Sequence, residues 1–131
     1  MGTDVAVFRE QDQSFLDSTG LSYEVEPVEG FVSLVVTGFP TAPGLSTPVV
    51  DLLLRLPHGF PDATPDMFWL SPAVTTAGGA KIPGTEVTET YYERAWQRWS
   101  RHIGGQWRPG VDNLETYVAY VRQCLRQAGG R

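Results

Sequence analysis

The uneven distribution of prolines constrains the fold of this chain more than any other feature. All ten lie between Pro27 and Pro109, so residues 1–26 and 110–131 contain none. Because proline lacks a backbone N–H donor and is excluded from helix interiors, long helices are expected only at the two ends. The chain therefore predicts an α+β fold, with a helix at each end and strands and turns between them.

Apolar spacing supports one helix at each end. Residues 8–17 carry three apolar side chains compatible with one helical face. The C-terminal helix has the clearer pattern, because Asp112 can cap it, Glu115 follows three residues later as in a capping box, and Gly129 and Gly130 stop it. Its apolar stripe comprises Leu114, Tyr117, Val118, Val121, Cys124 and Leu125.

Between these helices the chain predicts a four-stranded antiparallel meander. Alternation of apolar and polar residues, or a short apolar run, marks each strand. Residues 57–65 contain three prolines and predict a stiff connection before the last strand. Residues 75–90 are rich in Gly and Thr, which predicts a long exposed loop. The predicted strands are residues 21–26, 31–39, 49–56 and 67–70.

Composition limits the classes of protein that this chain can represent. With 131 residues, 41% apolar and 19% charged, it predicts one globular domain over residues 1–131. A single cysteine excludes an intramolecular disulfide, and two distant histidines make no metal site, so no metal or cofactor is expected. A net charge of -5 argues against binding to nucleic acid or an anionic membrane.

No segment approaches the ~20 consecutive apolar residues needed to cross a bilayer. The first residues also lack the basic start and apolar run of a secretory signal. We therefore expect a cytoplasmic protein without a membrane partner.

Residues 96–110 are the candidate site, because they hold three of the four tryptophans, one of the two histidines and three arginines. Ser100 and His102 are two apart, so in an extended chain their side chains share a face. In that geometry His102 can act as base to Ser100 or as acid to a leaving group. Candidate binding residues are Arg98, Trp99 and Arg101, whose cations would stabilise charge on a carbonyl oxygen.

The alternative interpretation of residues 96–110 is a small tryptophan core with arginines stacked on the rings. Cys124 is also a potential nucleophile, but its place on the apolar stripe of the C-terminal helix favours a packing role. His58, between Pro57 and Gly59, is interpreted as a turn residue.

Several segments resemble the ubiquitin-conjugating (UBC) fold. Residues 60–65, followed by residues 67–72, are similar to the proline-rich segment that joins the third and fourth strands in that family. Trp107 and Pro109 are similar to its Trp-x-Pro segment, and the likeness spans roughly residues 8–128. It implies a UBC-like fold in which a long irregular active-site segment separates the meander from the C-terminal helix.

Residues 98–102, with the Trp-x-Pro segment, look like a bacterial branch of this superfamily. Members of that branch occur with ubiquitin-like proteins and activating enzymes in conjugation operons. The resemblance therefore implies a ubiquitin-like protein and a ubiquitin-activating-like enzyme as partners. The chain departs from the family in one respect: residues 71–106 contain no cysteine and no His-Pro-Asn motif. The usual thioester mechanism therefore does not carry over.

Four hypotheses follow from this departure. In the first, the protein is a conjugating enzyme that forms an oxyester on Ser100 with help from His102. In the second, it is a catalytically inactive UBC-like variant that acts as an adaptor for a ubiquitin-like protein or its activating enzyme. A third holds that an active cysteine was replaced, for example at Ala95 or Ser100. A free-standing Ser/His hydrolase is disfavoured because no orienting acid is visible. We favour the first, because an adaptor has no need of a histidine beside a serine.

Overall fold

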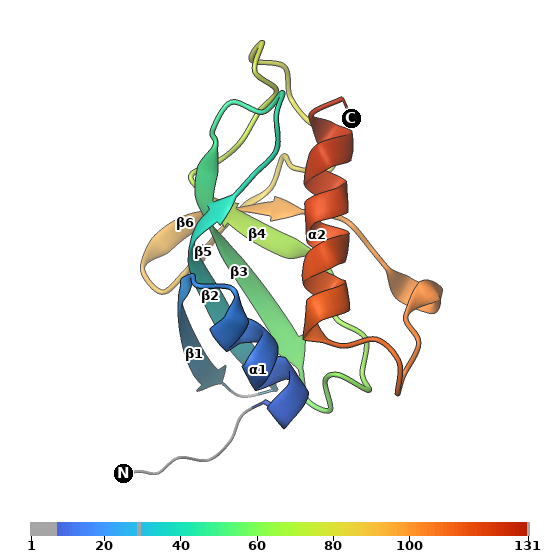
Figure 1. The fold of residues 1–131 in the computed structure, drawn as a ribbon. Helices are drawn as coiled ribbons and strands as arrows, with labels where there is room; N and C mark the ends of the chain where they lie inside the picture. Colours follow the sequence, from blue (N-terminus) through green and yellow to red (C-terminus); the bar gives the residue numbers. More distant parts are fainter. Residues whose placement is uncertain (1–7, 29, 131) are drawn as a thin grey trace.

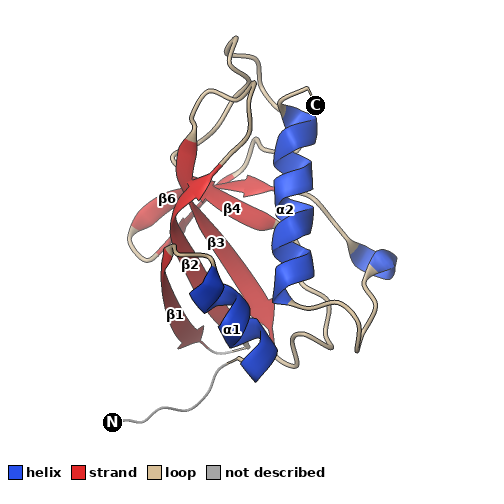
Figure 2. Cartoon of the chain, viewed as in Figure 1, coloured by secondary structure: helices blue, strands red, loops and turns tan. Residues whose placement is uncertain are grey.

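An antiparallel sheet of six strands forms the centre of the computed structural model, which describes residues 8–28 and 30–130. The strand order is β1-β2-β3-β4-β6-β5, and both α-helices lie on one face of the sheet (Figure 1; Figure 2). The α+β class and the two terminal helices are thus confirmed. The elements are α1 (Glu10–Ser18), β1 (Ser22–Val28), β2 (Phe31–Pro40), β3 (Val49–Pro57), β4 (Phe68–Ser71), β5 (Thr88–Tyr91), β6 (Arg94–Trp99), the 3-10 turn η1 (Gly104–Gln106) and α2 (Leu114–Ala128).

Alternation along β3 shows how the sheet divides its side chains between two faces. Leu52 and Leu54 enter the main core with the helices, whereas Leu53 belongs to a separate small cluster with Trp69 and Trp96. All six residues of the predicted stripe on α2 are buried against the main core. Burial of one apolar stripe is the main force that holds a helix of this length in place.

The hairpin of β5 and β6 corrects the prediction for the middle of the chain. The sequence predicts loop throughout residues 75–90, but Thr88–Tyr91 is a strand, and β6 occupies part of the predicted irregular segment. The turn between them is Tyr92–Glu93, with φ of 55° and 63°. Two-residue hairpin turns of this hand are usually marked by Asn or Gly, so the sequence carries no recognisable turn signal here.

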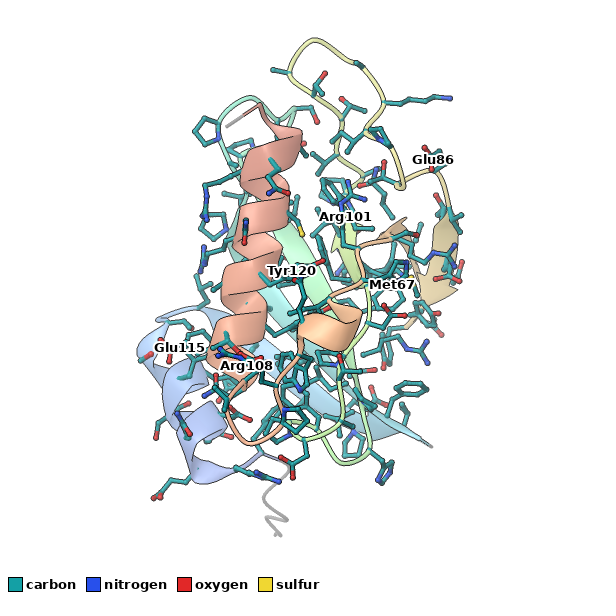
Figure 3. All side chains as sticks on the ribbon, turned by 90° about the vertical axis from the view of Figure 1, so that its right-hand side faces the viewer. Met67, Glu86, Arg101, Arg108, Glu115 and Tyr120 are labelled. Atoms are coloured by element: carbon teal, nitrogen blue, oxygen red, sulfur yellow. The ribbon has the colours of Figure 1, made fainter. Side chains whose placement is uncertain are left out.

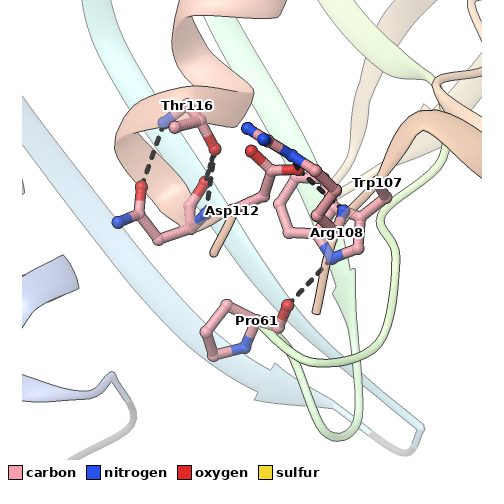
Figure 4. A network of polar contacts seen from close by, with 6 residues as sticks. Pro61, Trp107, Arg108, Asp112 and Thr116 are labelled. Carbon is pink, nitrogen blue, oxygen red and sulfur yellow. Dashed lines mark hydrogen bonds and ion pairs between the residues drawn. The ribbon is translucent and has the colours of Figure 1, made fainter. Parts of the chain in front are cut away.

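The cap of α2 also differs from the expected one. Asn113, not Asp112, is the N-cap: its side chain accepts from the Thr116 N–H at 3.1 Å, and its own N–H donates to the Thr116 hydroxyl at 2.8 Å (Figure 4). Asp112 instead accepts from the Arg108 N–H at 2.7 Å. That carboxylate closes the turn before the helix, so it is not available to cap it.

Gly129 and Gly130 end α2 as predicted. Gly129 is the C-cap, with a φ of -81° that any residue adopts, and Gly130 after it has a φ of 88°, the left-handed conformation that favours glycine. A Cβ at Gly129 would collide with the carbonyl oxygen of Pro43, and one at Gly44 would collide with the carbonyl oxygen of Gly129. The end of the helix is therefore pressed against the connection between β2 and β3. Within the described residues, no helix is long and apolar enough to span a membrane.

Asp12 joins the two helices. Its Oδ1 accepts from the Leu114 N–H at the start of α2, at 3.0 Å. The residue is only 2% exposed, and its Oδ2 has no partner among the described residues. Burial raises the pKa of Asp12, although the Leu114 hydrogen bond and the charge of Arg9 oppose the shift.

The raised pKa of Asp12 predicts a specific pH dependence. The folded protein keeps this proton at pH values where the unfolded chain has lost it, so the contribution of Asp12 to the free energy of unfolding falls as pH rises through that window. An asparagine side chain does not titrate. Asp12→Asn should therefore gain stability relative to the wild type as pH increases from about 3 to about 7. Urea unfolding of both proteins across this range measures the difference.

As the control, Asp12→Ala should be roughly 1–3 kcal/mol less stable than Asp12→Asn at all these pH values, because neither side chain titrates and only the alanine leaves the Leu114 N–H buried and unpaired. A difference between Asp12→Asn and the wild type that stays constant with pH would contradict the burial of this carboxylate.

Candidate functional site

The candidate site lies where β6 ends. Trp99, the last residue of β6, is fully buried and stacks on Phe68 of β4 with ring centroids 5.4 Å apart. Its indole N–H donates to the Gln97 side chain at 3.0 Å. Trp99 therefore packs in the main core and anchors the end of the strand, and its predicted binding role stays a prediction.

Gln97 holds the irregular segment after β4 against β6. Its side-chain oxygen accepts from the Val74 N–H at 2.8 Å, and its side-chain nitrogen donates to the Val74 carbonyl at 3.0 Å. One residue beyond the strand, the Ser100 N–H donates to the Gly84 carbonyl at 2.9 Å. These bonds fix both ends of residues 74–84 against β6 and the residue that follows it.

His102 is paired with an acid that no sequence pattern indicates. Its Nδ1 lies 2.5 Å from Oδ1 of Asp66, and both side chains are more than half exposed. Asp66 lies 36 positions away, in the connection before β4, and no spacing pattern links the two. Among the described residues, neither His102 Nε2 nor the Ser100 hydroxyl makes a hydrogen bond. The structure thus joins His102 to Asp66, but not to Ser100.

The segments around this pair are held together through Met67. Its N–H donates to the Arg101 carbonyl at 3.1 Å, and its carbonyl accepts from the Tyr117 hydroxyl of α2 at 2.6 Å. Met67 has a φ of 61°, a left-handed conformation that costs a non-glycine residue about 1–2 kcal/mol. Such strain persists only where the surrounding contacts hold it, and it occurs most often at functional sites.

Arg101 borders a second feature of the site, a hollow of about 540 Å³ between the end of α2 and residues 76–83. Its guanidinium lies over the Trp99 ring at 5.2 Å and donates to the Ser100 carbonyl at 3.2 Å. Figure 3 shows Arg101 on the chain that runs beside α2, the helix to which Tyr120 belongs. The lining residues are Thr76, Lys81, Ile82, Pro83, Arg101, Cys124, Gln127 and Ala128.

Cys124 reaches the wall of this hollow but is 4% exposed, which agrees with the packing role predicted for it. Burial raises the pKa of its thiol, while a hydrogen bond with Tyr120 and the charge of Arg101 oppose the shift. Because the thiolate is the nucleophile, a raised pKa leaves Cys124 poorly reactive at neutral pH.

Arg98 lies on the other face of the sheet from Trp99. It is opposite Trp69 in the sheet, on the face away from the helices, and pairs with Glu89 at 3.5 Å. There it lines a hollow of about 290 Å³ with Arg55 and Tyr91, and Asp66, the partner of His102, lines the same hollow. The predicted binding residues are therefore divided between two faces of the sheet.

The tryptophans are divided in the same way, so they do not form one small core. Trp107 packs in the main core with Trp99, and its indole N–H donates to the Pro61 carbonyl at 2.9 Å (Figure 4). Trp96 lies on the opposite face, under the guanidinium of Arg94 at 4.5 Å. The expected stacking of an arginine of residues 96–110 on a ring is present for Arg101 over Trp99, whereas the cation over Trp96 comes from outside that segment. In the part of the chain that the structure describes, no three His, Cys, Asp or Glu residues are grouped to hold a metal ion.

The hydrogen bonds of the Gln97 side chain predict how its replacement affects stability. Gln97→Leu leaves the Val74 N–H, the Val74 carbonyl and the Trp99 indole N–H without partners in a buried place. The free energy of unfolding should fall by about 3 kcal/mol or more, since each unpaired group costs roughly 1–3 kcal/mol. Thr88→Ala, at the exposed position opposite Gln97 on β5, should change it by less than about 0.5 kcal/mol. Urea unfolding checks both, and equal effects would contradict the role given to Gln97.

Comparisons with known proteins give one positive finding. No curated protein and no solved structure matches the chain. A family model described as "Prok-E2_E: Prokaryotic E2 family E" matches residues 8–128, which includes every helix and strand of the structure. The resemblance to conjugating enzymes noted from the sequence thus agrees with an independent comparison over the same residues. The chain belongs to prokaryotic E2 family E.

Proposed function

We propose that this protein is a conjugating enzyme that carries the carboxyl terminus of a ubiquitin-like protein as an oxyester on Ser100. Membership of an E2 family supports a role in conjugation. The observation that supports catalysis by this chain is the hydrogen bond between Asp66 and His102. His102 lies two residues after Ser100 in the sequence. No sequence pattern identified an acid that could orient the histidine of a nucleophilic site, and Asp66 can fill that role.

In the proposed first step, the Ser100 oxygen attacks the thioester carbonyl that links the ubiquitin-like protein to its activating enzyme. His102 takes the hydroxyl proton through Nε2 and passes it to the departing thiolate of the activating enzyme, so the ring is neutral again. In the second step, an amine of the acceptor attacks the oxyester, and His102 takes a proton from that amine and passes it to the departing Ser100 oxygen. The acyl group is thus transferred without a change of oxidation state.

Each residue of the candidate site has a separate role in this proposed reaction. Asp66 holds Nδ1 of His102, which leaves Nε2 for the proton of Ser100. Contact between His102 and Ser100 would be made in the complex with substrate, directly or through one water, because catalytic hydrogen bonds are often long before substrate binds. Arg101, whose guanidinium contacts the Ser100 carbonyl, supplies positive charge near the oxyanion. Arg98 and Trp99 stay proposed binding residues, with Trp99 acting through the packing of β6.

An oxyester reacts more slowly with amines than a thioester does, so this mechanism depends on the positive charge around Ser100. Lys81 and Arg101 both line the hollow beside the end of α2. The protein would take its acyl group from a ubiquitin-activating-like enzyme in the cytoplasm.

An adaptor role is the second candidate, and one observation favours it. The Ser100 hydroxyl makes no hydrogen bond to His102 in the structure. In this alternative, the same residues bind a ubiquitin-like protein or its activating enzyme without forming a covalent bond.

An adduct assay distinguishes the two candidates. The protein is incubated with ATP and with the activating enzyme and ubiquitin-like protein encoded in its own genome, and intact mass is measured. We expect an adduct equal to the sum of the two masses less one water, resistant to thiols and released by hydroxylamine. Ser100→Ala should abolish it. His102→Gln should slow its formation roughly 10²–10⁴-fold, as expected for loss of a general base.

Two controls make the assay decisive. Asp66→Asn should slow adduct formation with less effect than His102→Gln, because the ring stays but loses its orienting charge. Cys124→Ala should leave the adduct intact. An adduct that persists in Ser100→Ala and disappears in Cys124→Ala would overturn the oxyester, and a complex without any adduct would favour the adaptor.

A further inference from the structure

A separate hollow of about 230 Å³ lies on the face of the sheet that the helices leave uncovered. It is formed by β1, β2 and the hairpin of β5 and β6, and it includes none of residues 98–102. Its size is below the roughly 300–1,000 Å³ of pockets that bind whole small molecules, and it suits a single side chain. The lining residues are Glu24, Glu26, Ser33, Val35, Tyr92, Arg94 and Trp96.

Ser33 is the unusual member of this set. It is 2% exposed, and its hydroxyl oxygen has no hydrogen-bond partner among the described residues. It lies opposite Glu26 on β1 and opposite Arg55 on β3, in the middle of paired strands. A buried hydroxyl without a partner destabilises a protein, and an apolar β-branched residue would suit such a strand better. An unpaired hydroxyl at the wall of a hollow therefore points to a group that enters from outside.

The charges around the hollow indicate the sign of that group. Glu24 and Glu26 are exposed on β1, and neither forms an ion pair with another described residue. Arg94 is the one cation of the lining, and Asp51 already neutralises it at 3.0 Å while its guanidinium covers the Trp96 ring. Two carboxylates thus stay uncompensated, and they attract a cation.

We propose that this hollow binds the ammonium group of a lysine side chain presented by a partner protein. An ammonium has three N–H donors, and the hollow offers three acceptors: the carboxylates of Glu24 and Glu26 and the hydroxyl of Ser33. The rings of Tyr92 and Trp96 supply apolar surface for the alkyl stem. The planar fork of arginine is wider and matches paired acceptors in one plane, so lysine is the better fit.

This lysine would be a docking contact and not the acceptor of the proposed acyl transfer. The hollow shares no residue with the surroundings of Ser100, so a nucleophile bound there does not meet the oxyester. The inference therefore goes beyond the proposed function, and it holds for an enzyme and for an adaptor alike.

The test uses the whole protein and Nα-acetyl-lysinamide as the probe. We expect a saturable shift of the Trp96 indole N–H signal in nitrogen-labelled protein, with affinity on the order of millimolar because a single side chain makes few contacts. Nα-acetyl-norleucinamide, which keeps the alkyl stem but lacks the charge, should cause no saturable shift. Nα-acetyl-argininamide should bind at least about fivefold more weakly than the lysine probe.

Variants separate the site from general electrostatics. Glu24→Gln and Glu26→Gln should each weaken lysine binding at least about fivefold, because each removes one charged acceptor. Glu10→Gln, on the exposed face of α1, removes the same charge elsewhere and should leave affinity unchanged. Ser33→Ala should weaken binding about threefold while raising Tm, because it removes an unpaired buried hydroxyl.

Four results would overturn the proposal: no saturable shift with the lysine probe, equal shifts with the norleucine probe, tighter binding of the arginine probe, or equal losses in Glu10→Gln and Glu26→Gln. The titration needs no activating enzyme or ATP. Its failure is therefore distinguishable from a failure of the acyl-transfer proposal.

Discussion

The buried side chain of Gln97 connects parts of the molecule that the hydrogen bonds of the sheet leave separate. One amide satisfies both backbone groups of Val74 and the indole of Trp99. Low polarity in the interior strengthens such bonds and makes each of them costly to break. The amide thereby fixes the irregular chain after β4 against the end of β6. The position of Ser100, one residue beyond that strand, follows from this contact and from its own bond to Gly84.

The sequence predicts best where one periodic pattern is enough. It predicts the stripe of α2 residue by residue, because burial of one helical face leaves a regular spacing. It does not predict the hairpin of β5 and β6, because Tyr92 and Glu93 adopt left-handed conformations without the glycine or asparagine that normally marks them. The predicted cap is wrong because Asp112 is as well suited to the role as Asn113, and only the fold shows that Arg108 uses its carboxylate.

The site shows a stronger limit on prediction from sequence. His102 is identified from its neighbours in the chain, whereas its partner Asp66 comes from a connection that packs beside it only in the folded protein. Arg98 and Arg101 are close in sequence but belong to opposite sides of the sheet, since a strand alternates its side chains and then ends between them. Proximity along the chain therefore groups residues that the fold separates, and it misses one that the fold supplies.

The close approach of Gly129 to the Pro43 carbonyl at the end of α2 fixes the length of that helix. Each added residue turns a helix by about 100° and advances it by about 1.5 Å. An insertion within α2 would replace Gly129 with a residue that carries a Cβ, directly against the Pro43 carbonyl. It would also rotate the wall that Cys124 and Gln127 contribute to the hollow beside Arg101. The register of α2 therefore sets the shape of the cavity beside the proposed nucleophile, so insertions and deletions should be tolerated in the surface turns of this protein but not in its last helix.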